Sequence, residues 1–195
     1  MILKLADFWD EVAQNHDIRA IVLTGSGDQA FSSGGDLGTL IPLMMKTRSP
    51  QGPWEEKFAA NRKSLGRALL RDVPFYKPVI AAVNGHAYAG GLEMVLCCDF
   101  AYGVPQARFA LTEVTIGIMP GAGGTQNLPR AVGERRAKEI ILTGRPFSAQ
   151  EALDWGVLNR VIEPQDLLPQ ALDTARRIAA NAPLSVRQEI GRAHV

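Results

Sequence analysis

The amino-acid sequence predicts an α/β domain in which most strands pair in parallel. Two apolar runs, residues 18–24 and 78–84, are separated by segments with helical spacing of apolar residues. The second run, Pro78-Val-Ile-Ala-Ala-Val-Asn84, is almost continuously apolar, as in a strand that is buried on both faces. Because strands joined through helices return in the same direction, this order favours mainly parallel pairing.

The first half of the chain is predicted to contain two helices, two strands and one long irregular segment. Apolar residues recur at helical spacing over residues 3–14, and residues 18–24 form a strand that ends at Gly25. Several prolines interrupt residues 37–62, which we interpret as a mobile loop with helical pieces. A helix over residues 64–71 then precedes the buried strand at 78–84.

The second half is predicted to be mainly helical. A short buried helix over residues 92–98 is followed by short strands over 100–103 and 108–111. Ser148 with Glu151 three residues later forms a capping box that begins a helix ending at Gly156. The other predicted elements are helices over 125–132, 134–142 and 165–180, a strand over 157–162, and a further helix from Pro183.

Length, composition and charge restrict the class of protein. The 195 residues suffice for one domain, and 46% hydrophobic with 21% charged residues fits a protein with a packed core. A formal net charge of +1 argues against a general nucleic-acid binder. No apolar run is long enough to cross a bilayer, and acidic residues interrupt the N-terminal stretch as they would not in a signal peptide. We expect a cytoplasmic protein with no nucleic-acid or membrane partner.

The cysteines do not indicate a disulfide or a metal site. Cys97 and Cys98 are adjacent, so they cannot join distant segments, and the two-residue spacing of metal-binding pairs is absent. We expect a buried, reduced pair in a cytosolic protein and no bound metal.

Two glycine-bearing turns could present backbone N–H groups to a ligand. Ser32-Ser-Gly-Gly-Asp36 follows the first strand, and its glycines leave no Cβ between the backbone and a ligand. Gly90 precedes an apolar helix, and the N-terminus of a helix favours a developing negative charge. Each turn alone could equally be a tight turn or a packing contact. Together they suit an oxyanion.

Two glutamates are candidates for proton transfer. Glu93 lies one turn into an otherwise apolar helix, where a carboxylate is costly unless it has a partner or a function. Glu113 follows a strand and precedes a loop rich in glycine, so it can face a cleft. Asp99 is a weaker candidate because it follows the helix, away from Gly90. Two carboxylates in different environments can supply both an acid and a base.

Several motifs occur in an order that carries a specific resemblance. They are Ala30-Phe-Ser-Ser-Gly-Gly-Asp-Leu37, Lys77-Pro-Val-Ile-Ala-Ala-Val-Asn-Gly85, Ala89-Gly-Gly-Leu-Glu93, Cys98-Asp99, Phe109-Ala-Leu-Thr-Glu113 and Gly117-Ile-Met-Pro-Gly-Ala-Gly-Gly-Thr-Gln126. From about residue 18 to residue 186 the chain resembles the crotonase superfamily, and within it the enoyl-CoA hydratases. The resemblance implies a spiral of ββα units and assembly as a homotrimer or hexamer.

The resemblance also implies roles for individual residues. The N–H groups of Gly35 and Gly90 would form the oxyanion hole. Glu93 and Glu113 match the two catalytic glutamates of the family, Glu93 activating the water and Glu113 protonating Cα of an α,β-unsaturated acyl-CoA. Further substrate contacts would come from Ser33, Asp36, Leu37 and Gly91. No metal or separate cofactor is implied, since coenzyme A is part of the substrate.

The chain departs from the family pattern in three places. It lacks the usual N-terminal β-hairpin, and almost all of the C-terminal helical region is missing. Residues 40–63 are longer than the usual loop and carry Trp54, so we expect them to shape the acyl pocket. The last residues, Glu189-Ile-Gly-Arg-Ala-His-Val195, match the translation of a common sequencing adapter. We therefore expect a partial crotonase-like core over 1–188 and a non-native tail over 189–195, in which His194 has no function.

Other functions remain open. Family isomerases usually keep only the second glutamate, so the presence of both favours a hydratase over an isomerase or another crotonase-type enzyme. An inactive truncated fragment is a further alternative. Gly25-Ser-Gly-Asp-Gln-Ala30 loosely fits a dinucleotide-binding fingerprint, but no helix begins there and no acidic residue follows about twenty positions on. Gly121-Ala-Gly-Gly-Thr125 lacks the lysine of a phosphate-binding loop.

Overall fold

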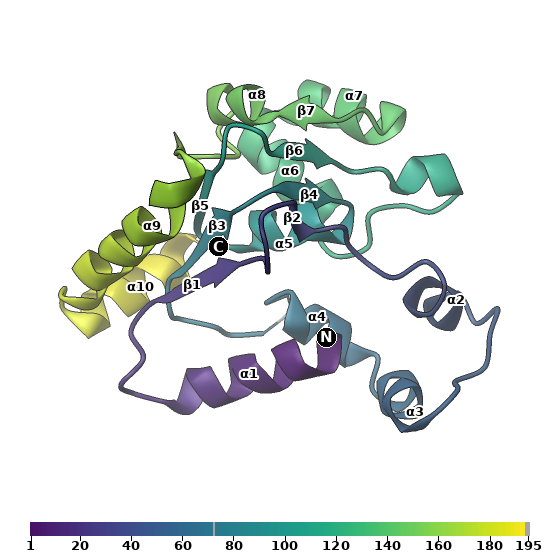
Figure 1. Ribbon diagram of the computed structural model, residues 1–195. Helices are drawn as coiled ribbons and strands as arrows, with labels where there is room; N and C mark the ends of the chain where they lie inside the picture. Colours follow the sequence, from purple (N-terminus) through teal and green to yellow (C-terminus); the bar gives the residue numbers. More distant parts are fainter. Residues whose placement is uncertain (72, 194–195) are drawn as a thin grey trace.

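The computed structural model describes residues 1–71 and 73–193, which form two four-stranded sheets with helices packed around them (Figure 1). The first sheet has the strand order β1-β3-β5-β8 and is parallel throughout. The second has the order β2-β4-β6-β7, and only β6 and β7 run antiparallel. The predicted α/β class with mainly parallel pairing is therefore confirmed.

The strands are short, and most of the helices are longer. The strands are β1 (Ile21–Thr24), β2 (Ala30–Ser32), β3 (Val79–Val83), β4 (His86–Tyr88), β5 (Phe100–Gly103), β6 (Arg108–Ala110), β7 (Phe147–Ser148) and β8 (Arg160–Val161). The helices are α1 (Ile2–Gln14), α2 (Leu40–Met44), α3 (Pro53–Ala60), α4 (Lys63–Ala68), α5 (Gly90–Cys97), the 3₁₀ turn η1 (Glu113–Ile116), α6 (Gly124–Val132), α7 (Glu134–Thr143), α8 (Ala149–Asp154), α9 (Pro164–Ala179) and α10 (Pro183–Ala193).

Consecutive strands alternate between the two sheets, which produces the expected spiral. The pairs β1–β2, β3–β4 and β5–β6 each place one strand in the first sheet and the next in the second. Gly85 forms the turn between β3 and β4, where a Cβ would lie 2.3 Å from the carbonyl oxygen of Gln29. Only glycine allows the backbones of successive spiral turns to approach so closely.

The core lies around β3 and the helix that follows β4. All five residues of β3 are buried, which confirms the prediction of a strand covered on both faces. Helix α9 packs across β1, β3 and β5, whereas α5 packs against β2 and β4. Phe109 and Phe147 stack at 5.5 Å between ring centroids and are fully buried. Helix α5 is thus fixed between the second sheet and α6, which also packs on it.

The N-terminal helix and the segment before β3 form a separate layer. Helices α1 and α4 lie side by side below the sheets in Figure 1. The indole N–H of Trp9 donates to the carbonyl of Ala68 at 2.9 Å, which joins the two helices in a buried position. Residues 37–62 contain α2 and α3, so the prediction of a loop with helical pieces is confirmed.

None of the helices in residues 1–71 and 73–193 has the length and apolar character needed to cross a membrane.

The C-terminal part of the chain follows its predicted helices closely. Helix α10 begins at Pro183 as predicted and continues to Ala193. His194 and the final valine lie outside the described residues.

Candidate active site

The two glycine-bearing turns press against each other although they are far apart in the sequence. Gly34 has φ +89°, and a Cβ at this position would lie 2.8 Å from the backbone nitrogen of Gly90. A Cβ at Gly90 would lie 3.7 Å from the backbone nitrogen of Gly35. Because both positions lack a Cβ, the N–H groups of Gly35 and Gly90 border the same small space.

The N–H of Gly90 lies at the start of a helix. Helix α5 begins at Gly90, and its first backbone hydrogen bond runs from Glu93 N–H to Ala89 C=O at 3.1 Å. No backbone hydrogen bond found in the described part of the chain uses the N–H of Gly35 or of Gly90. Ala89 has φ +50°, a conformation that is strained for a residue with a side chain. The strained residue, Ala89, thus immediately precedes Gly90, whose N–H is the candidate donor.

A cavity of about 470 Å³ opens beside the two turns. Gly35, Asp36 and Gly90 line it, together with residues 1–5 at the start of α1. Its apolar lining comes mainly from Leu40, Leu43, Trp54, Phe58, Leu65, Leu69 and Met94. Several of residues 40–63 therefore line this cavity, and its use as the acyl pocket stays a prediction; the contribution of α1 is an addition from the structure.

The other predicted substrate contacts lie outside this cavity. Ser33, Leu37 and Gly91 are not among its lining residues in the described structure, and neither are the two glutamates, Glu93 and Glu113. A Cβ at Gly91 would lie 2.0 Å from the carbonyl oxygen of Ser32, so this glycine permits α5 to pack closely on β2. Their assigned role in substrate binding stays a prediction.

Asp36 organises the turn that carries Gly35. Its Oδ1 accepts hydrogen bonds from the hydroxyl of Thr39 at 2.7 Å and from the N–H groups of Thr39 at 2.6 Å and Gly38 at 3.0 Å. The Thr39 hydroxyl and these N–H groups hold the pKa of Asp36 below its ordinary value. The carboxylate thus fixes the backbone between Gly35 and α2.

Glu93 is a buried carboxylate with two backbone partners. It is 3% exposed, and its Oε1 accepts from the N–H groups of Ala122 at 2.7 Å and Gly124 at 2.8 Å. Burial raises the pKa of Glu93, while the Gly124 and Ala122 N–H groups and then the charge of Arg71 act to lower it. The sequence contains this glycine-rich loop, but its pairing with Glu93 results from tertiary structure and was not predicted.

Glu113 is buried with much less support. It is the first residue of η1, which begins shortly after β6 ends at Ala110, and it is 6% exposed. Its Oε2 is buried and has no hydrogen-bond partner among the described residues. Burial raises the pKa of Glu113 to about 7, its own backbone N–H opposes this, and the charge of Glu93 adds to it. Compared with Glu93, Glu113 is therefore better suited to retain a proton near neutral pH.

Other reactive side chains have structural roles. Asp99 Oδ2 accepts from the N–H of Val79 at 2.7 Å at the start of β3. His86, the exposed first residue of β4, accepts at Nδ1 from the N–H of Arg108 at 3.1 Å. Cys97 and Cys98 are free and half-buried rather than fully buried. Over residues 1–71 and 73–193, no group of three or more His, Cys, Asp or Glu side chains could hold a metal ion.

Comparisons with known proteins agree with this architecture. Residues 1–191 match the family model described as "Enoyl-CoA hydratase/isomerase". The (E)-benzylidenesuccinyl-CoA hydratase of Thauera aromatica is 40% identical over 183 residues, which are 94% of this chain and 67% of the relative. The crotonyl-CoA hydratase of Syntrophomonas wolfei is 38% identical over 188 residues, with 95% and 68% covered.

A solved structure shows the same fold. The crystal structure of an enoyl-CoA hydratase from Bacillus anthracis superposes with a TM-score of 0.80 at 38% sequence identity. The alignment covers 95% of this chain and 68% of that protein. The chain thus spans about two thirds of the length of the proteins it resembles.

Proposed function

Because this chain belongs to the enoyl-CoA hydratase/isomerase family of enzymes, we propose that it adds water across the double bond of an α,β-unsaturated acyl-CoA. The observation that carries the proposal is the unequal pair of buried glutamates. Glu93 accepts two backbone N–H bonds, whereas Oε2 of Glu113 has no partner within the described structure. Two coupled carboxylates in unlike environments can act as base and acid at the same pH.

The proposed reaction begins with attack on Cβ. Glu93, as the carboxylate, removes a proton from water while the water oxygen forms its bond to Cβ. The π electrons move towards the thioester oxygen, where the N–H groups of Gly35 and Gly90 would stabilise the developing charge. Such stabilisation lowers the barrier most when the donors are fixed before the reaction.

The second half of the reaction places hydrogen on Cα. Glu113, in its protonated form, donates to Cα as the enolate collapses to the thioester. Glu93 then carries a proton and Glu113 a negative charge, so a proton passes between them, or through solvent, before the next turnover. The charge of Glu93 raises the pKa of Glu113, which supports an electrostatic interaction between the two carboxyl groups.

The family resemblance also supports a proposal for assembly. We propose that the intact protein assembles as a homotrimer or hexamer, as the resemblance implies. Large apolar side chains of η1, the following loop and α7 are exposed and would be covered by such a contact. They are Val114, Ile116, Met119 and Leu142.

Substitution of the two glutamates tests the proposed function. Glu93→Gln and Glu113→Gln should each lower kcat by roughly 10²–10⁴-fold with little change in KM, measured by loss of the enoyl-thioester absorbance. The double variant should lose less than the product of the single effects. Glu134→Gln, an exposed glutamate paired with Lys138, is the matched control and should retain full activity.

Two results would contradict the proposal. A wild-type protein that hydrates no enoyl-CoA in a panel of short, long and aromatic acyl chains would reject hydratase activity. If Glu93→Gln left the reaction intact while Glu113→Gln abolished it, a mechanism with one glutamate, as in an isomerase, would replace it.

A further inference from the structure

We propose that Arg71 is a positioning residue, which orients Glu93 through the peptide group that joins Gly121 to Ala122. The inference rests on the proposed hydration, in which Glu93 is the base. Arg71 follows α4 and is contributed by a different part of the chain from either glutamate. Its role is to act on Glu93 without contacting the substrate.

One peptide group lies between the two side chains. Arg71 Nη1 donates to the carbonyl oxygen of Gly121 at 2.8 Å. The N–H of Ala122, the next residue, donates to Glu93 Oε1 at 2.7 Å. Because a peptide is planar, this carbonyl and this N–H are opposite ends of one rigid unit. A contact that fixes the carbonyl therefore also fixes the direction of the N–H towards Glu93.

The loop needs such a restraint because it is rich in glycine. Gly117 and Gly123 both have positive φ, and Gly121 and Gly124 add further conformational freedom. The N–H of Gly124, at 2.8 Å from Glu93 Oε1, holds the far side of the loop. Arg71 supplies the second restraint, on the side of Gly121.

The contact is also electrostatic. A guanidinium bound to a carbonyl polarises the peptide and makes its N–H a stronger donor. A stronger donor favours the charged form of the carboxylate that accepts from it. The positive charge of Arg71 acts in the same direction, since it lowers the pKa of Glu93 against the effect of burial. Geometry and charge thus both assist Glu93 in acting as a base.

Among the charged and titratable side chains described near Glu93, Arg71 is the one whose positive charge lowers the pKa of Glu93. The charge of Glu93 raises the pKa of Glu113 and of Cys97, so neither of these two groups assists the ionisation of Glu93. The elements packed against α5 carry four further titratable or charged side chains, whose polar or ring contacts in the described structure are with other residues. They are Arg130 with Asn127, His86 with Arg108, Tyr88 with His86, and Tyr102 with Thr174.

The test compares Arg71→Gln with Arg71→Lys. The acid limb of the kcat/KM profile should move up by about half to one pH unit in Arg71→Gln, since Glu93 becomes harder to ionise. At pH values on the acid limb, kcat/KM should fall roughly fivefold, whereas at higher pH it should change little; KM should be unchanged. Arg71→Lys keeps the charge and should shift the limb less. Arg135→Gln, which removes an exposed arginine of α7, is the control for net charge.

A measurement independent of activity separates this inference from the proposed function. Carbon-13 NMR of labelled glutamate side chains, with Glu93 identified by Glu93→Gln, should show a higher Glu93 pKa in Arg71→Gln than in wild type. This result is expected even if no enoyl-CoA is hydrated. An unchanged Glu93 titration in both Arg71 variants, or an activity loss equal at every pH, would overturn the inference.

Discussion

Gly34 illustrates how one absent Cβ can define a site. This residue neither ionises nor carries a side chain, yet its Cα lies beside the Gly90 backbone. Any Cβ at this position would point at the nitrogen that the proposed reaction uses as an oxyanion donor. Gly34 therefore contributes through the absence of a side chain, which leaves the N–H of Gly90 accessible to a substrate.

We expect Gly34→Ala to abolish most activity while the protein remains folded. On the present backbone a methyl group would lie 2.8 Å from the Gly90 nitrogen, which is too close, so the turn must shift and the donor is displaced or blocked. Loss of one oxyanion donor typically lowers the rate by about 10²–10³-fold. Steady-state hydration kinetics, with circular dichroism to confirm folding, measure this effect.

Gly27→Ala is the matched control. Gly27 also has positive φ, +79°, but a Cβ there would meet nothing within 4 Å. This substitution introduces backbone strain of the same kind without touching the Gly90 nitrogen. Equal activity losses in the two variants would show that strain, rather than obstruction of the donor, explains the Gly34 effect.

At the residue level, the sequence predicts groups that are unusual in their local context. Glu93 in an apolar helix and the paired glycines can be recognised without a structure. The partners of Glu93 cannot, because Ala122 and Gly124 offer only backbone N–H groups that every residue possesses. Arg71 likewise has no local pattern, since its contact with Gly121 depends on how α4 is placed.

At the element level, a helix or strand can be predicted from the sequence when it is long enough to show a repeated spacing of apolar residues. The buried strand β3 and the amphipathic helices were predicted, because several residues in each repeat one pattern. β2, β4 and β7 have two or three residues, too few for a period, and they were not predicted, whereas the equally short β6 and β8 were predicted as part of longer apolar runs. Strand β1 begins at Ile21 rather than Ile18, and β8 spans only Arg160–Val161, because strand limits depend on pairing with neighbours.

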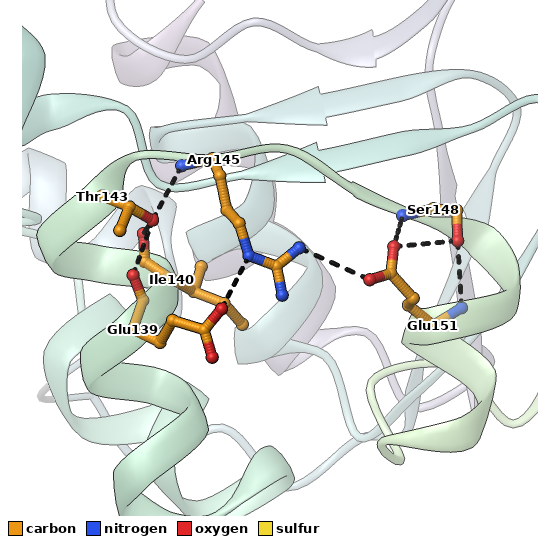
Figure 2. A network of polar contacts seen from close by, with 6 residues as sticks. All are labelled: Glu139, Ile140, Thr143, Arg145, Ser148 and Glu151. Atoms are coloured by element: carbon orange, nitrogen blue, oxygen red, sulfur yellow. Dashed lines mark hydrogen bonds and ion pairs between the residues drawn. The ribbon is translucent and has the colours of Figure 1, made fainter.

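The start of α8 is the clearest element boundary in the sequence. Ser148 accepts from the N–H of Glu151 at 3.1 Å, and Glu151 accepts from the N–H of Ser148 at 2.7 Å, as Figure 2 shows. Arg145 bridges Glu151 at 3.4 Å and Glu139 of α7 at 3.1 Å in the same network. The predicted capping box is confirmed, and Arg145 links its Glu151 to Glu139 of α7.

Ser148→Ala should therefore destabilise the protein by about 1 kcal/mol, the usual cost of losing an N-cap side chain. The Glu151 N–H would lose its acceptor, and α8 would fray at its first turn. Urea unfolding measures the change in the free energy of unfolding. Ser26→Ala, at an exposed position outside helices and strands, should change it little, and equal values for both variants would contradict a special role for the cap.

At the scale of the whole molecule, the two glutamates come from successive turns of the spiral. Glu93 belongs to α5 after β4, and Glu113 follows β6, the neighbouring strand in the second sheet. The fold thus brings two carboxyl groups into its interior from different turns. Burying these carboxyl groups lowers the stability of the fold. In the proposed function the burial is needed, because it gives the two glutamates unequal pKa values and so lets one act as base and the other as acid.

The pH dependence of stability should reveal this cost at Glu113. Its pKa rises from an ordinary 4.5 to about 7 on folding. Below pH 4.5 both folded and unfolded chains carry the proton, so the group has no effect. Between these values the unfolded chain ionises first, and stability falls as pH rises. Above pH 7 the loss reaches its limit, on the order of 3 kcal/mol.

Glu113→Gln should remove that loss, since the amide resembles the protonated acid in shape and cannot ionise. Urea unfolding should find the variant more stable than wild type at pH 8 and nearly equal to it at pH 4. Glu134→Gln should behave in the opposite way, because Lys138 lowers the pKa of this exposed carboxylate and ionisation there is slightly favourable. A Glu113→Gln protein that is less stable than wild type at pH 8 would mean that the folded protein stabilises ionised Glu113. The assignment of Glu113 as the acid would then have to be exchanged with that of Glu93.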